Sequence, residues 1–257
     1  MKECIINKHN VVLYDSIDEL PIMRFHKYNK MLLVDAGVGS DLSDFDRHIE
    51  KVIRYLNSPT PNMATVELEN MRQNIYFIQS EVSPRHLAFA VLVKSINGKP
   101  RNDLSDDGLQ QTISLFKDVA NSEITAHLEA VKKKIDDELR LYFPRLFDDA
   151  TLKEYYDKLK QRTIVVLRTI IDGRATEADA KEIDDITAEL ITYFNPQMFT
   201  GSESVEIRHD RQFENMCLIL SQNLHVDPKK FTVLEYYNAF EYIKEQAKKA
   251  NKQKKVK

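Results

Sequence analysis

Apolar residues recur with helical spacing along most of this chain. Between residues 42 and 56 they return every three or four positions, which predicts an amphipathic helix with one apolar stripe. The members of this stripe are Leu42, Phe45, Ile49, Val52, Ile53 and Leu56. A helix of a globular protein normally turns such a stripe toward the core. We therefore expect these side chains to be buried.

Similar patterns predict helices along the rest of the chain. They cover residues 20–34, 62–79, 84–97, 105–119, 122–142, 150–172 and 176–194, then a segment around 213–224 and a last helix that starts at 232. Ser83 before Pro84, Thr176, and Thr232 with Glu235 have the character of N-terminal caps. Residues 87–93 are apolar nearly all round, so the 84–97 helix is expected at the centre of the core.

The N-terminus has a different pattern. Two short β-prone runs, Cys4–Ile6 and Val11–Tyr14, flank a polar centre and predict either a hairpin or an arm that adds to the sheet of another molecule. A lone two-stranded hairpin is marginal in water, so this segment needs support from the body or from a neighbour. We expect it to be the only notable β-structure.

The low content of turn residues supports a helical fold. Six glycines and eight prolines in 257 residues are few for a β-sandwich or an α/β fold. The sequence predicts an all-α, multi-helix bundle with a small N-terminal β-hairpin or arm. Its parts are an arm over 1–18, a helical body over 19–247 with a subdomain joint near 143–149, and a basic flexible tail over 248–257.

Charge and cysteine content exclude several classes of protein. A net charge of −3 argues against a globally basic nucleic-acid binder, and two distant cysteines exclude a disulfide framework. No run approaches the roughly 18 apolar residues of a membrane-spanning helix, and the polar N-terminus does not resemble a signal peptide. We expect a soluble protein with no membrane partner, made in the cytoplasm.

No motif predicts an active site. The glycines in Gly37-Val38-Gly39-Ser40 follow a predicted helix and have acidic neighbours, so they favour an interhelical turn over a phosphate loop. The seven histidines lack zinc-site spacing, and no serine lies in a G-x-S-x-G elbow. We expect no catalytic residue, no metal and no cofactor.

Two sets of residues are candidates for partner contacts. The first holds β-prone and aromatic residues expected at an interface: Val11, Val12, Leu13, Tyr14, Tyr236 and Tyr237. The second holds basic residues of the C-terminal run, which are either a solvated helix end or contacts for DNA or an acidic partner: Lys248, Lys249, Lys252, Lys254 and Lys255.

Residues 14–21, the Tyr28-Asn29 pair and the Asp35-x-Gly37-x-Gly39-Ser40 pattern resemble a family of structural proteins of tailed bacteriophages of the crAss-like kind. The resemblance covers about the first hundred residues, and more loosely the last helix. It implies a virion component present in many copies, such as a ring at the head–tail connection or in the tail. Its neighbours would be other virion proteins, including the portal and adjoining ring or tail proteins. It transfers no catalytic residue.

Three functions follow from these observations. The first is a structural subunit of a ring or connector, which needs large lateral interfaces and forms a homo-oligomer. The second is a cytoplasmic adaptor or assembly chaperone that binds another virion protein. The third is an enzyme whose site is dispersed over helix ends.

Overall fold

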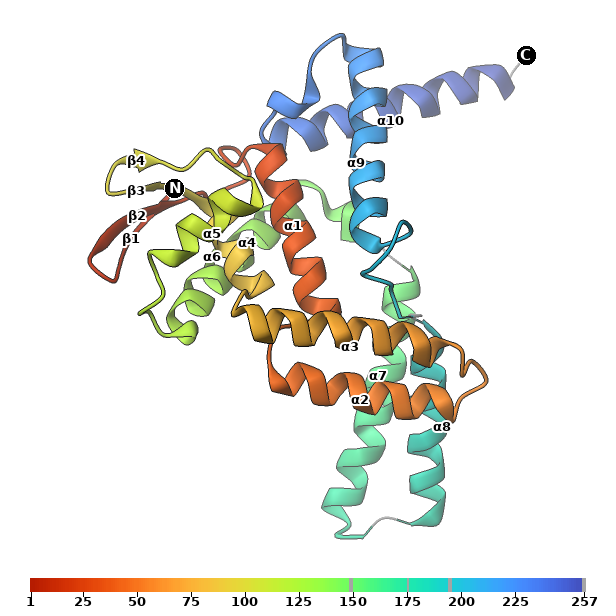
Figure 1. The fold of residues 1–257 in the computed structure, drawn as a ribbon. Coiled ribbons are helices and arrows are strands. Elements are labelled where there is room, and N and C mark those ends of the chain that lie inside the picture. Colours follow the sequence, from red (N-terminus) through yellow and green to blue (C-terminus); the bar gives the residue numbers. More distant parts are fainter. Residues whose placement is uncertain (148–149, 175, 194–195, 256–257) are drawn as a thin grey trace.

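The computed structural model describes residues 1–147, 150–174, 176–193 and 196–255. In this part of the chain 70% helix and a small antiparallel sheet confirm the prediction of an all-α fold with an N-terminal β-element (Figure 1). The α-helices are α1 (Ile22–Gly37), α2 (Leu42–Leu56), α3 (Met63–Ser80), α4 (Pro84–Leu92), α5 (Asp106–Ser114), α6 (Asn121–Tyr142), α7 (Ala150–Ile171), α8 (Glu177–Tyr193), α9 (Val205–Leu224) and α10 (Val233–Lys255). Short 3-10 helices cover Pro144–Phe147 and Pro228–Lys230.

The sheet contains the predicted hairpin and two further strands. Its strands are β1 (Lys2–Ile6), β2 (His9–Leu13), β3 (Val93–Ile96) and β4 (Lys99–Pro100), paired antiparallel in the order β1-β2-β3-β4. The expectation that the N-terminal segment is the only β-structure is therefore wrong. The hairpin obtains the support that it needs from β3 of the same chain.

Helix α4 ends earlier than the sequence predicted because long-range contacts stop it. The buried guanidinium of Arg24 donates to the carbonyl oxygens of Val91 at 2.6 Å and Val93 at 3.1 Å, and also to that of Arg101. The chain then turns at Asn97-Gly98, where both residues have positive φ, as in a two-residue hairpin turn. Asn97-Gly98 therefore forms the turn of the β3–β4 hairpin, where the sequence predicted the end of a helix.

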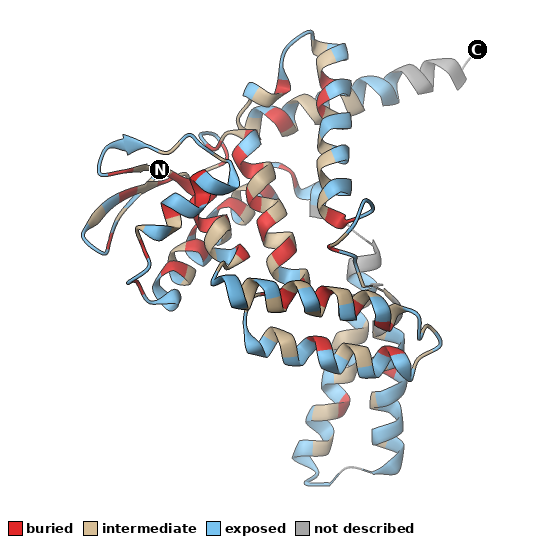
Figure 2. Ribbon diagram, in the orientation of Figure 1, coloured by how far each residue is buried: buried red, intermediate tan, exposed pale blue. Residues whose placement is uncertain are grey.

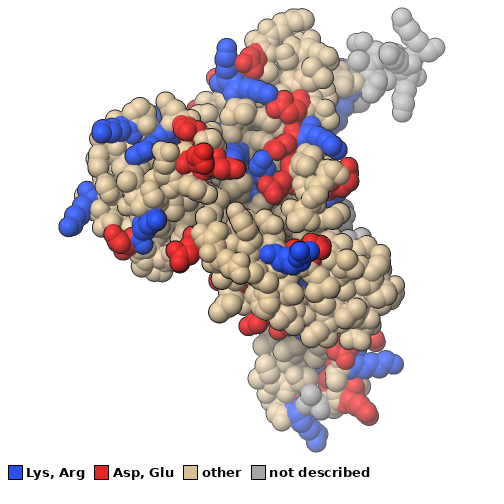
Figure 3. Space-filling view, in the orientation of Figure 1, with Lys and Arg blue, Asp and Glu red and all other residues tan. Residues whose placement is uncertain are grey.

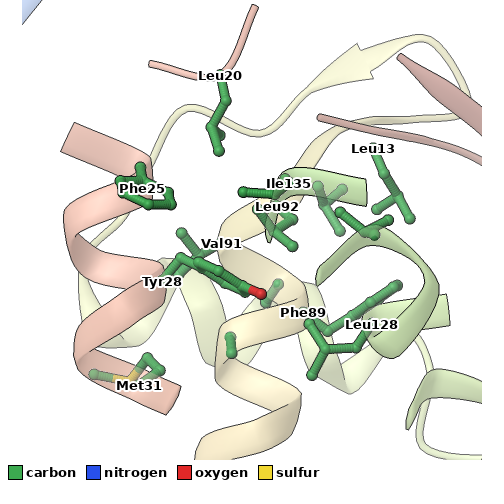
Figure 4. Packing of buried hydrophobic residues seen from close by; sticks show 14 of the residues in the cluster. Leu13, Leu20, Phe25, Tyr28, Met31, Phe89, Val91, Leu92, Leu128 and Ile135 are labelled. Atoms are coloured by element: carbon green, nitrogen blue, oxygen red, sulfur yellow. The ribbon is translucent and has the colours of Figure 1, made fainter. Parts of the chain in front are cut away.

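The main core lies between α1, α4, α6 and the inner face of the sheet (Figure 4). Phe89 of α4 is at its centre with 1% exposure, as predicted for this helix. The apolar stripe of α6 is buried from Ile124 to Leu139, but Tyr142 at the end of the helix is exposed. Figure 2 shows buried residues concentrated in this region and few of them in α7 and α8.

Two of the predicted caps form as expected. Thr232 and Glu235 make a reciprocal capping box at the start of α10, with N–H to oxygen distances of 2.8 and 3.3 Å. Asp179 donates its N–H to Thr176 Oγ1 at 3.1 Å at the start of α8.

The starts of α1 and α10 are joined by their backbones, although nearly the whole chain separates them. The N–H of Ile22 donates to the carbonyl of Phe231 at 2.8 Å, and the N–H of Val233 donates to that of Leu20 at 2.9 Å. We call this contact the α1–α10 junction. It fixes the C-terminal helices to the N-terminal part of the core.

The molecule is elongated, with α9 and α10 at one end and the α7–α8 hairpin at the other (Figure 1). Its accessible surface is 16001 Å². A compact monomer of the same mass, 29.9 kDa, has a surface of roughly 11,700 Å². The chain therefore exposes far more surface than folding of a single compact copy requires.

Candidate interaction surface

Helix α2 forms where it was predicted, but its apolar stripe faces away from the core. Leu42 is 70%, Ile53 54% and Leu56 60% exposed, and Ile49 is also classed as exposed. Phe45 and Val52 are half-buried. The prediction that this apolar stripe is buried is therefore wrong. We call the four exposed residues Leu42, Ile49, Ile53 and Leu56 the α2 stripe.

Polar residues occupy the inner side of α2 in place of the stripe. The fully buried ring of His48 contacts the Glu67 carboxylate through Nδ1 at 2.7 Å and the carbonyl of Val38 through Nε2 at 2.9 Å. The amide of Asn74 donates to the same carbonyl at 3.1 Å, and Lys51 lies 3.5 Å from Glu67. These contacts satisfy polar groups whose burial would otherwise be costly. They hold α2 and α3 to the end of α1 with the α2 stripe outward.

The turn before α2 is built by local hydrogen bonds. Asp41 is the N-cap and accepts the N–H of Asp44 at 2.9 Å, while Asp44 Oδ2 accepts the N–H of Ser40 at 2.9 Å. The Ser43 hydroxyl and this N-cap bond hold the pKa of the Asp41 carboxyl below its ordinary value. Gly39 has φ +70°, and a Cβ there would overlap the Asp44 carboxylate. The glycines thus form the interhelical turn that the sequence predicted.

The exposed face of α2 continues onto α3. Leu68 and Tyr76 of α3 are 42% and 59% exposed. Figure 3 shows few charged side chains over the face of α2 and α3 that is turned to the viewer. Large exposed apolar patches are uncommon in a monomer and mark sites of interaction with other molecules.

Helix α7 carries a second exposed apolar stripe. Ile164, Leu167 and Ile171 are three and four positions apart and are 48%, 51% and 81% exposed. We call these three residues the α7 stripe. The opposite side of α7 packs on α8, where Val165 and Ile186 are buried. In the described part of the chain, this hairpin thus buries one side of α7 and leaves the other exposed.

Two of the four predicted interface residues near the N-terminus are buried. Val11 and Leu13 have 0% exposure and belong to the core, while Val12 and Tyr14 are half-buried. The reason is that Val11 and Leu13 lie on the same face of β2, and this face packs against the main core. Both edges of β2 are also occupied, by β1 on one side and β3 on the other. The hairpin is therefore part of the body. Its outer edge, β1, has no paired strand in the described sheet, and Ile5 on this strand is 77% exposed.

The predicted tyrosines are not surface residues. Tyr236 is buried at 6% exposure and Tyr237 is half-buried against the core. Tyr236 stacks on Phe213 of α9 with ring centroids 5.9 Å apart, and Tyr237 contacts Phe143 at 5.4 Å. Their aromatic surface therefore attaches α10 to the rest of the same chain.

The basic run lies on the last part of α10. Lys248 and Lys249 are exposed, in agreement with a role in contacts outside the chain. Lys252, Lys254 and Lys255 belong to the same helix, but their side chains lie outside the described residues. The backbone is helical through Lys255, where the sequence predicted a flexible tail.

A histidine cluster between α1 and α9 is the arrangement closest to a catalytic one. His26 Nε2 lies 2.8 Å from Asp210, which also accepts from Lys30 at 2.9 Å, and the His26 ring stacks on His209 and Phe213. Burial lowers the pKa of both histidines, and for His26 this outweighs the opposite effect of Asp210. Among the described residues, no serine, threonine or cysteine hydrogen-bonds to His26. The cluster attaches α9 to α1.

A large open cleft between α2, α4, α5 and α6 has a volume of about 1320 Å³. Three of its carboxylates are engaged in the fold, since Asp35 pairs with Arg85 at 3.0 Å and Asp41 and Asp44 build the turn described above. Glu81, Asp107 and His86 also line the cleft. Burial raises the pKa of Asp35, although Arg85 opposes this.

In the described part of the chain no three His, Cys, Asp or Glu side chains are grouped as metal ligands. Within the same residues, no helix is both long enough and apolar enough to cross a bilayer. No protein-family model matches the sequence, and no curated protein or solved structure is significantly similar to it.

Proposed function

We propose that this protein is a non-enzymatic structural subunit that works as a multimer through its exposed helical surfaces. On the basis of the resemblance over residues 14–56, we place this multimer in a tailed-phage particle, as a ring or connector at the head–tail junction or in the tail. Its partners there are copies of itself and the neighbouring virion proteins, and it is assembled in the host cytoplasm.

The observation that carries the proposal is the outward orientation of the α2 stripe. Full burial of a Leu or Ile side chain contributes about 1.5–3 kcal/mol. The fold leaves this free energy unused at Leu42, Ile53 and Leu56, while it buries a polar network on the other side of the same helix. Such an arrangement is expected when a partner covers the apolar side. The large total surface supports the same conclusion.

Native mass spectrometry and light scattering of the purified chain test this proposal. We expect an oligomer of high order for the natural sequence. Changing Ile53 and Leu56 to lysine should shift the mass toward the monomer, because both side chains are exposed in one copy and would be covered in the multimer. Leu218→Lys on α9 is a matched control, since Leu218 is 57% exposed but lies outside the α2 stripe.

A monomer at every concentration for the natural sequence would contradict the proposal. The virion assignment has its own test, which is quantitative proteomics of purified particles of the source phage. Many copies per particle are expected, and absence of the chain from particles would remove that assignment.

The free edge of β1 favours a second function. An adaptor or assembly chaperone binds another virion protein, and a strand of the partner can add to an exposed sheet edge through main-chain hydrogen bonds. Replacing Ile5 with proline removes a backbone donor on β1 and should weaken such binding. A monomeric chain that loses its partner after this change would favour the adaptor over the ring subunit.

Contact of the basic end of α10 with DNA is a further part of the proposal. Lys248 and Lys249 are exposed, and binding through them should weaken as salt increases because each contact releases counterions.

A further inference from the structure

The two apolar stripes are on opposite sides of the molecule. A cavity of about 700 Å³ separates the helices that carry them, and its lining includes Lys51, Arg54 and Tyr55 of α2 together with Tyr155, Leu159 and Arg162 of α7. With about 100° between successive residues of a helix, these lining positions are on the faces opposite to the stripes. The α2 stripe and the α7 stripe therefore point away from each other. In Figure 1, α7 and α8 lie behind α2 and α3.

The charges beside the two stripes are of opposite sign. Asp46 and Glu50 are exposed and follow the α2 stripe along one side, and Glu50 also pairs with Arg54 of the same helix at 3.6 Å. Lys153, Lys160 and Arg168 are exposed on the same face of α7 as its stripe, where Asp157 is the one acidic residue among these neighbours. Two copies of the α2 face would bring like charges together, as would two copies of the α7 face. One face of each kind brings unlike charges together, which favours that pairing.

The placement of the two stripes on opposite sides of the chain also determines the symmetry of the assembly. A contact between two different faces leaves one α2 stripe and one α7 stripe free at the ends of every dimer, so further copies can add. Such a heterologous contact generates a closed ring if its rotation closes, or a filament if it does not. Two standard interfaces per chain cover about 1,600 Å². The surface in excess of a compact monomer is larger than this.

We propose that the α2 stripe of one copy packs against the α7 stripe of the next copy, head to tail around the assembly. This inference rests on the proposed function and names the two surfaces that form its repeating contact. Apolar contact between the stripes supplies the stability, and the acidic and basic borders select the unlike pairing.

Two variants with one altered face each test this contact. The α2 variant carries Ile53→Lys and Leu56→Lys, and the α7 variant carries Leu167→Lys and Ile171→Lys. These side chains are more than half exposed in a single copy, so both variants should fold. Unfolding curves of both variants, compared with the Leu218→Lys control, check this. Native mass spectrometry then measures each variant alone and a mixture of the two.

The head-to-tail contact predicts a distinctive set of masses. Each variant alone should be a monomer, because its only possible contact pairs an intact face with an altered one. The mixture should give a dimer with one copy of each variant and nothing larger, because one intact α2 stripe meets one intact α7 stripe. The natural chain and the control should form the full oligomer.

Each other result overturns the inference. A dimer of the α7 variant alone would mean that α2 stripes pair with each other, and a dimer of the α2 variant alone would mean that α7 stripes do so. If both variants keep the full oligomer, the contact lies elsewhere and the proposed function survives without this interface. If the natural chain is a monomer, both the interface and the proposed function fail.

Discussion

Glu67 offers a direct test of the orientation of α2. It is 2% exposed, and its carboxylate contacts the ring of His48 at 2.7 Å and the ammonium of Lys51 at 3.5 Å. Glu67→Ala removes this acceptor and leaves the His48 ring nitrogen buried without it. Breaking a buried pair costs about 3–5 kcal/mol, and we expect about 3 kcal/mol here because Lys51 remains partly exposed to water.

Urea denaturation followed by circular dichroism, at concentrations where the chain is monomeric, measures this loss of unfolding free energy. Glu69→Ala is the control from the same helix, because Glu69 makes only an exposed pair with Arg72 at 3.1 Å. We expect the control to change stability by about 0–0.5 kcal/mol. Equal effects of the two substitutions would refute the polar interior of the α2–α3 pair. The apolar side of α2 would then face the body, and the interaction surface would be lost.

Three further predictions concern the core, a cap and pH. Leu128→Ala should cost about 2–5 kcal/mol in urea denaturation, because Leu128 has 0% exposure; a loss under 1 kcal/mol would contradict its central place. Thr232→Ala should cost about 1 kcal/mol in the same assay, because the α10 cap loses its side-chain acceptor, whereas no change would mean that the capping box is not formed. Burial lowers the pKa of His26 and His209 in the folded chain, so the unfolded chain binds more protons and unfolding free energy should fall as pH drops below about 6.5. Urea midpoints at pH 7.5 and 5.5 measure this, and an equally large difference in a His26→Gln, His209→Gln variant would assign the effect to other groups.

The helices were predictable from sequence because their apolar spacing, caps and breakers are local signals. The direction in which α2 faces was not, because an amphipathic pattern shows that one side meets an apolar environment without showing whether core or partner supplies it. A usable signal was present in α3. Its residues Ala64, Glu67, Asn70 and Asn74 recur with helical spacing and form its buried side. A polar inner face on one helix indicates that the neighbouring helix buries polar groups as well.

The missed strands have a different cause. Residues 87–92 form the helix that was predicted, but residues 93–96 form a strand instead of its last turn, and Asn97-Gly98 is as good a hairpin signal as a helix end. What decides between them is the contact of Arg24 with carbonyls far along the chain. The interface residues Val11 and Leu13 were misjudged because the pairing of β2 with β3, which holds the hairpin against the core, was not recognised.

The α1–α10 junction has a consequence for the order of events during synthesis. Residues 20–22 leave the ribosome long before their backbone partners at 231–233 are made. Until then the N–H of Ile22 and the carbonyl of Leu20 have only water as partners, and the side of the core that α10 covers stays open. Domains generally fold as units during synthesis. In this chain, the α1–α10 junction cannot form before residue 233 has been translated, so a chain that stops earlier lacks the contact that joins the C-terminal helices to the core.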